Sequence, residues 1–121
     1  MLEVIIKSNE FKVKKGMEDA FESLLNQISS EGEFLYNRDE KDVFSFASQG
    51  DLYLEDEDGE SIYNDDVLEK LLPFVSEDEP IIILEVDYEE LLHTNAYLTR
   101  ITSKGMDFKR IDDLAQICFT N

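Results

Sequence analysis

The distribution of charge is the feature that most restricts how this chain can fold. Residues 51–90 contain sixteen acidic side chains and one basic side chain, Lys70, whereas the remaining 81 residues contain thirteen acids and ten bases. Nearly all of the formal net charge of −18 therefore lies in one third of the chain. So much charge of one sign in a small volume destabilises a folded domain through self-repulsion. We call residues 51–90 the acidic block.

The rest of the composition is typical of a folded protein. Of the 121 residues, 42% are hydrophobic, and eight Phe and five Tyr are among them. A disordered acidic chain would be poor in aromatic and branched residues. At this length roughly two thirds of the unfolded surface can be buried, enough for one domain with its own core. We expect a single domain over 1–121, with the acidic block crossing several of its elements.

The first part of the chain predicts strands around one helix. Apolar and β-branched residues predict a strand over 2–7, and alternation of apolar and basic residues predicts a half-buried strand over 11–14. Apolar residues at three- and four-residue spacing predict an amphipathic helix over 17–28. Two further strands are predicted over 33–36 and 42–47.

The acidic block begins with a predicted hairpin and continues into a helix. Strands are expected over 51–54 and 61–63, on either side of an acidic turn. Asn64 and the two acids after it are good N-cap residues for a second amphipathic helix over 67–75. Pro73 should shorten or kink this helix, because proline lacks the N–H that a helix needs.

The last part of the chain predicts mainly strands. Residues 81–84 are apolar without alternation, which favours a central strand buried on both faces. A helical turn is expected over 89–94, then a hairpin over 96–111 with Gly105 in its turn. Asp112 and Asp113 are suited to cap a short C-terminal helix. The order of elements predicts an α+β fold with a mostly antiparallel sheet and two main amphipathic helices.

Residues for catalysis or for a cofactor are few. His93 and Cys118 are the only histidine and cysteine, too few for a structural zinc site or a nucleophile–base pair. The glycines are isolated, so there is no phosphate-binding loop. Around Gly59 an EF-hand pattern fails, because Leu54 stands where the first acidic ligand belongs. We therefore expect no enzyme activity, no catalytic residues, no metal site and no cofactor.

One enzymatic alternative stays open. Glu85 and Asp87 project from the same side of a predicted strand, as carboxylates do in metal-dependent nucleases. However, no lysine lies between Lys70 and Arg100 to assist an attacking water. A nuclease should also attract nucleic acid, which this charge repels.

The acidic block points instead to a basic protein as partner. A charge of −18 repels DNA, RNA and anionic membranes, so direct binding to nucleic acid or a membrane is not expected. Carboxylates displayed along a surface can occupy a groove that normally binds phosphates. In charge alone the chain resembles the small acidic inhibitors that phages and mobile elements direct against restriction or CRISPR nucleases. The predicted partner-binding residues are Asp51, Glu55, Asp56, Glu57, Asp58, Glu60, Asp65, Asp66, Glu69, Glu77, Asp78 and Glu79.

Two other functions fit the same charge. An immunity protein that neutralises a basic toxin would use the same electrostatic attraction with a different partner. An acidic adaptor, whose charge only improves solubility, is the other. No apolar run approaches the roughly 18 residues of a membrane span, and the N-terminus does not resemble a signal peptide. The chain is therefore expected to be cytoplasmic.

Overall fold

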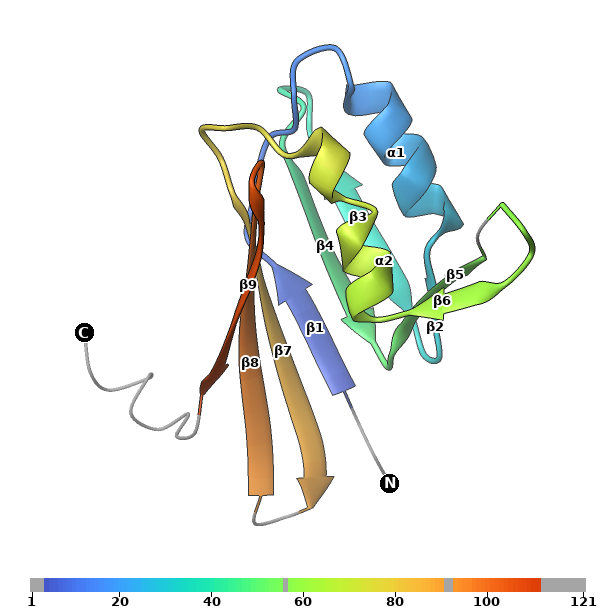
Figure 1. The fold of residues 1–121 in the computed structure, drawn as a ribbon, viewed down its shortest axis with the longest axis vertical. Coiled ribbons are helices and arrows are strands. Elements are labelled where there is room, and N and C mark those ends of the chain that lie inside the picture. Colours follow the sequence, from blue (N-terminus) through green and yellow to red (C-terminus); the bar gives the residue numbers. More distant parts are fainter. Residues whose placement is uncertain (1–3, 56, 91–92, 112–121) are drawn as a thin grey trace.

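A six-stranded antiparallel sheet forms the larger part of the fold (Figure 1). The computed structural model describes residues 4–55, 57–90 and 93–111. The strands of this large sheet are β1 (Val4–Ser8), β3 (Phe34–Arg38), β4 (Phe44–Gln49), β7 (Ile81–Glu90), β8 (His93–Thr102) and β9 (Gly105–Ile111). They lie in the order β3-β4-β1-β7-β8-β9, so the first strand of the chain pairs with β4 on one side and with β7 on the other.

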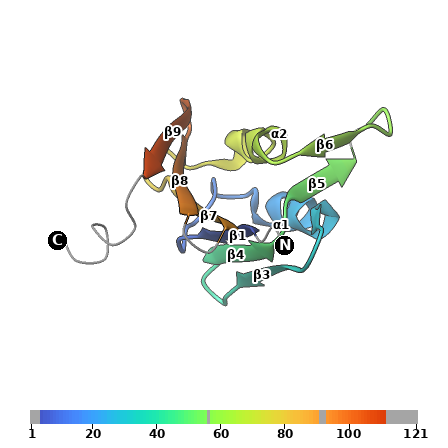
Figure 2. The same cartoon turned by 90° about the horizontal axis from the view of Figure 1, so that it is seen from below.

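A small sheet and two helices make up the rest of the described fold. The small sheet contains β2 (Ser29–Ser30), β5 (Leu52–Glu55) and β6 (Ser61–Tyr63). The helices are α1 (Glu18–Gln27) and α2 (Asp65–Glu69), and a 3-10 turn, η1 (Leu72–Phe74), follows α2. Figures 1 and 2 show both helices on the same side of the large sheet, while the far ends of β7 and β8 extend beyond them.

The core lies between the two helices and the side of the large sheet that faces them, which we call the inner side. Strand alternation places Ile6, Phe46 and Ile83 on the inner side, and all three are buried. Phe21 of α1 packs edge-on against Phe44 of β4, with ring centroids 5.0 Å apart. Large buried aromatic side chains of this kind contribute much of the apolar burial that stabilises a small domain.

Several predictions from the sequence are confirmed. The fold is α+β with an antiparallel main sheet. The predicted hairpin over 96–111 is formed by β8 and β9, and Gly105 at the start of β9 has a φ of 147°.

Two other predictions are not confirmed in full. The strand predicted over 11–14 is reduced to isolated bridges at Phe11 and Val13. The predicted C-terminal helix lies outside the described residues.

The second helix is shorter than the predicted range of 67–75. α2 ends at Glu69, and Pro73 lies in η1. A continuous helix would need an N–H at Pro73 to bond the Glu69 carbonyl, and proline has none. Asn64 precedes α2, but its side chain does not cap the helix. Its Oδ1 instead accepts a hydrogen bond from the Leu52 amide at 3.1 Å, which attaches the start of α2 to β5.

β7 is a central strand, as the sequence predicts, with β1 on one side and β8 on the other. Two other predictions for β7 and β8 are wrong. Ile81 and Ile83 are buried, but Ile82 and Leu84 are only half-buried. These two face the outer side of the sheet, which neither α1 nor α2 covers. The helical turn predicted over 89–94 is also wrong, because residues 89 and 90 continue β7 and residues 93 and 94 begin β8.

Candidate functional site

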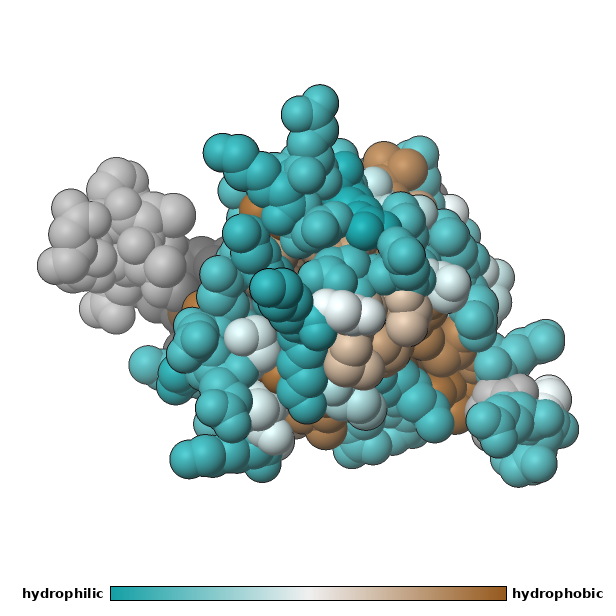
Figure 3. All heavy atoms as spheres, turned by 90° about the horizontal axis from the view of Figure 1, so that it is seen from above, coloured by the Kyte–Doolittle hydropathy of each residue, from teal (hydrophilic) through white to brown (hydrophobic). Residues whose placement is uncertain are grey.

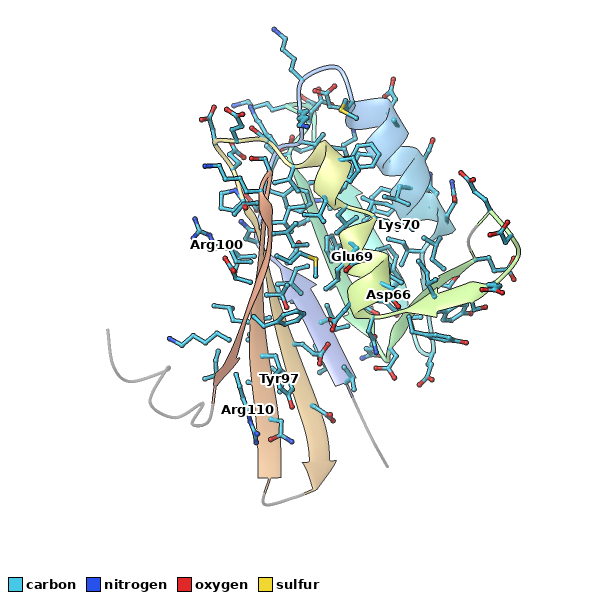
Figure 4. The ribbon with its side chains drawn as sticks, viewed as in Figure 1. Asp66, Glu69, Lys70, Tyr97, Arg100 and Arg110 are labelled. Atoms are coloured by element: carbon cyan, nitrogen blue, oxygen red, sulfur yellow. The ribbon has the colours of Figure 1, made fainter. Side chains whose placement is uncertain are left out.

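The inner side of the large sheet changes from apolar to acidic along β7. Ile81 and Ile83 point to the core, and Glu85 and Asp87 follow at the next two positions on the same side. In the neighbouring strand the partner of Glu85 is Tyr97. In Figure 4, Tyr97 lies on the part of β8 that extends below α2. The acidic positions therefore lie where the helices no longer cover the sheet.

An open cleft of about 580 Å³ lies at this uncovered end. Its lining residues come from β1, the start of β5, the start of α2 and the three strands β7, β8 and β9. They are Val4, Asp51, Asn64, Asp65, Glu85, Asp87, Tyr97, Thr99, Phe108 and Arg110. We call this the acidic cleft, because four of its side chains are carboxylic acids. Val4 and Arg110, from opposite ends of the described chain, meet in it.

Backbone contacts hold the two acids that come from outside the large sheet. The Gly50 amide donates a hydrogen bond to the Val4 carbonyl at 2.7 Å, which places Asp51 beside β1. Val4 in turn pairs with Asp87 across the β1–β7 ladder. Asp65 follows Asn64, whose amide donates to the Leu52 carbonyl at 3.0 Å. The fold thus brings β5 and α2 to the acidic end of β7.

The carboxyl groups of the cleft affect one another electrostatically. Burial raises the pKa of the Glu85 carboxyl above its ordinary value, and the charge of Asp65 raises it further. Asp51 and Asp87 act on this pKa in the same direction. Burial also raises the pKa of Asp65, with a smaller contribution from Asp66. The cleft therefore holds like charges close together at some cost in stability.

The cleft also has aromatic, hydroxyl and basic parts. Phe108 on β9 leaves 55% of its surface exposed. Arg110, two residues further along β9, donates a hydrogen bond from Nη2 to Asn95 Oδ1 at 3.1 Å. The Oδ1 atom of Asp87 is buried and has no hydrogen-bond partner among the described residues. Carboxylate acceptors beside ring faces are suited to bind a guanidinium or ammonium group.

The structure divides the predicted partner-binding residues among four places. Asp51 and Asp65 line the cleft. Glu55, Glu57, Asp58 and Glu60 belong to the β5–β6 hairpin, which projects from the body of the molecule (Figures 1 and 2), and Asp66 and Glu69 are exposed on α2. Glu77, Asp78 and Glu79 lie in the loop before β7. Asp56 lies outside the described residues.

The loop before β7 is at the opposite end of the sheet from the cleft. The Lys12 amide donates a hydrogen bond to Glu79 Oε2 at 2.7 Å, so the loop is attached to the segment after β1. Seven residues of extended chain separate Pro80 from Asp87, a length of about 23 Å at 3.3 Å per residue. Figure 3 shows the loop end of the molecule, where hydrophilic side chains cover most of the surface. The acidic block is thus not one continuous surface.

Sequence reasoning missed part of the cleft. The sequence points to Glu85 and Asp87 only as carboxylates of a metal-dependent enzyme, and it indicates no role for Tyr97, Phe108 or Arg110. The signal for the acids was present, because the inward positions of 81–87 read Ile, Ile, Glu, Asp. A change from apolar to acidic side chains on one face indicates where the cover of that face ends. The contribution of β9 could not be read without the strand register.

The described residues agree with only one part of the metal-dependent alternative. Glu85 and Asp87 do lie on the same side of β7. Among residues 4–55, 57–90 and 93–111, no three Asp, Glu, His or Cys side chains are arranged to hold a metal ion. What the described cleft offers is a set of negatively charged acceptors.

Acids outside the acidic block are arranged differently. Arg38 on β3 binds Asp19 and Glu22 of α1 through Nη1, at 3.0 and 2.8 Å, and Asp42 through Nη2, at 2.8 Å. Its guanidinium also lies over the Phe44 ring, 5.4 Å from the centroid. These contacts fasten α1 to the large sheet. The acids of this region are therefore used within the fold.

Comparison with known proteins gives no relative from which a function can be transferred. No protein-family model, curated protein or solved structure matches this chain. In the part of the chain that the structure describes, no helix has both the length and the apolar character needed to cross a membrane. The cleft, the hairpin and their charge are the features from which a function can be inferred.

Proposed function

We propose that this protein is a non-enzymatic binding protein whose acidic end occupies the nucleic-acid-binding groove of a basic partner. The partner would be a nucleic-acid-binding protein or a nuclease, and the proposed location of the complex is the cytoplasm. The observation that carries the proposal is the acidic cleft, where four carboxylic side chains gather from distant parts of the chain. Their mutual repulsion destabilises the fold, so an external use for this arrangement is a reasonable inference.

The shape of the acidic end supports the same proposal. The cleft accommodates basic side chains that project from a partner, and the hairpin beside it carries Glu55, Glu57, Asp58 and Glu60 away from the body. Duplex DNA presents one charge per roughly 1.7 Å of its axis. A partner that binds such a dense row of phosphates has the basic groove that this end would fill. Complementary charge of this kind also accelerates association.

The test compares two variants that lose the same charge at opposite ends. The cleft variant carries Asp51→Asn, Asp65→Asn, Glu85→Gln and Asp87→Asn. The control variant carries Glu10→Gln, Glu40→Gln, Glu77→Gln and Asp78→Asn, which are exposed and lie away from the cleft. Wild type and both variants are immobilised, incubated with lysate of the source cell at low salt and eluted with rising salt.

We expect the same basic, nucleic-acid-binding protein on the wild type and on the control variant. The cleft variant should bind it at least about tenfold more weakly, since losing closely paired charges costs roughly 2–5 kcal/mol and about 1.4 kcal/mol is a factor of ten. A captured toxin nuclease would make the protein an immunity protein. Equal binding by all three proteins, or stronger loss in the control variant, would show that the cleft is not the interface.

A further inference from the structure

Two tyrosines are exposed on the outward side of the β5–β6 hairpin. Tyr53 and Tyr63 face each other across the ladder, with 36% and 56% of their surfaces exposed. Their ring centroids are 6.3 Å apart, and the ring planes are inclined at 46°. We call Tyr53 and Tyr63 the tyrosine pair. Exposed aromatic side chains on a projecting hairpin are typical anchors of protein interfaces.

The tyrosine pair is not required for the core. Leu52 and Leu54 point inward from β5 and leave only 1% and 5% of their surfaces exposed. The outward positions of β5 are Tyr53 and Glu55. Tyr53 therefore has a carboxylate two residues away on its own side of the strand, whereas the corresponding position beside Tyr63 on β6 is Ser61.

A hollow of about 400 Å³ lies beside this outward row. It is lined by Gln27 at the end of α1, Ser29, Tyr53, Leu54 and Glu55. The described part of the lining thus provides an aromatic ring, a carboxylate, an amide, a hydroxyl and the apolar Leu54, and no basic side chain. A planar guanidinium can stack on a ring and donate to a carboxylate at once, whereas an ammonium group cannot stack in this way.

We infer, resting on the proposed function, that the tyrosine pair and this hollow bind arginine side chains of the basic partner. The surrounding acids supply the charge complementarity, and the rings supply a preference for arginine over lysine. Nucleic-acid bases could also stack on tyrosine, but the neighbouring carboxylates repel a phosphate backbone. A second copy of the chain would bring two acidic hairpins together, which like-charge repulsion opposes.

The experiment uses two synthetic peptides of equal charge. One alternates six arginines with glycines, and the other alternates six lysines with glycines. Calorimetric titration at low salt measures both affinities for the wild type and for the double variants Tyr53→Ser/Tyr63→Ser and Tyr53→Phe/Tyr63→Phe. The single variant Leu35→Ser is the control, because Leu35 is a large apolar residue with 59% of its surface exposed that lies on β3, outside both the cleft and the hollow. Thermal unfolding confirms that each variant is folded.

The wild type should bind the arginine peptide roughly threefold more tightly than the lysine peptide, in the range expected for exposed cation–ring contacts. The Phe variant and Leu35→Ser should keep this preference, and the double Ser variant should lose it while still binding both peptides. Equal affinities in the wild type, or a preference that the double Ser variant keeps, would overturn the inference about the pair. Self-association or DNA binding that disappears in the Ser variant would overturn it as well. Failure of the wild type to bind either peptide would instead refute the proposed function.

Discussion

At the scale of single residues, Glu85 best shows how the acidic cleft is built. It occupies an inward position on β7, where the two preceding inward positions hold buried isoleucines. Because neither α1 nor α2 covers the sheet at this point, a carboxylate can be placed there. Burial and the charges of Asp65 and Asp51 nevertheless raise the pKa of Glu85. A carboxyl group whose pKa is higher in the folded state than in the unfolded state destabilises the folded state at neutral pH.

Replacing this carboxylate by an amide should therefore stabilise the protein at neutral pH. Above the raised folded-state pKa of Glu85 its charge disfavours folding, and the penalty disappears once pH falls below the unfolded-state pKa of about 4.3. We expect Glu85→Gln to raise Tm at pH 7 by roughly 1–3 °C, a small effect because the side chain is partly open to solvent. Thermal unfolding followed by circular dichroism from pH 7 to pH 4 should show the gain shrinking.

The control for this prediction is Asp107→Asn on the exposed part of β9. It removes one charge from the same molecule but does not line the cleft. A smaller gain in Tm is expected for it. Equal gains from both variants would show that only the total charge matters, and a loss of Tm in Glu85→Gln at pH 7 would contradict the electrostatic account of the cleft.

At the scale of elements, the connection between β4 and β5 decides where the acidic block lies. Gly50 in this connection has a φ of 85°, and a Cβ added to it would lie 2.9 Å from the Glu31 Cβ. Gly59 at the tip of the hairpin has a similar φ of 81°, but an added Cβ would meet nothing within 4 Å. Both positions favour glycine for their backbone, and only Gly50 also requires it for space.

Alanine at these two glycines should therefore destabilise the protein to different extents. Gly59→Ala should cost about 1 kcal/mol, from the left-handed backbone alone. Gly50→Ala should cost roughly 1–3 kcal/mol more, because overpacking is added to the same backbone strain. Urea unfolding of both variants measures the difference. Equal losses in the free energy of unfolding would mean that the chain around Glu31 shifts easily to make room for the added methyl group. Gly50 would then not determine how closely β5 packs against this part of the chain.

The elements show how far the sequence alone determines the fold and the site. Alternation and turn residues were sufficient for the α+β class and for the β8–β9 hairpin. Pro73 predicts that the helix over 67–75 is shortened, and α2 does end at Glu69, with Pro73 in the 3-10 turn that follows. Residues 81–84 predict burial on both faces, because four apolar residues in a row do not indicate which side of the strand faces outward. The cleft depends on the pairing of β7, β8 and β9. The register between strands cannot be predicted from a local sequence pattern.

At the scale of the whole molecule, charge is distributed unevenly over a small fold. The acids of the acidic block are divided between the cleft, the hairpin and the loop before β7, and their repulsion acts through the surrounding solvent. Such repulsion between exposed groups is screened by salt, with a Debye length of about 10 Å at 0.1 M. Stability should therefore depend on ionic strength more than in a protein of balanced charge.

We expect Tm at pH 7 to rise with added sodium chloride and to rise modestly from pH 7 to pH 5.5. The second effect follows because raised pKa values, such as those of Glu85 and Asp65, let part of the repulsion disappear as pH falls. The cleft variant should show a weaker dependence on both conditions than the control variant, although both carry the same charge. Melting curves that do not change with salt or pH would show that the acids are too dispersed to act on one another.

The most direct test of the proposed function is competition with nucleic acid for the partner. A fluorescent duplex is first bound to the captured partner, and the protein is then added in increasing amounts at fixed salt. If the acidic end occupies the nucleic-acid groove, wild type and the control variant should release the duplex in step with their own binding, and the cleft variant should require at least about tenfold more protein. A stable complex of partner, duplex and wild-type protein together would contradict the account, because it would place the protein outside the groove.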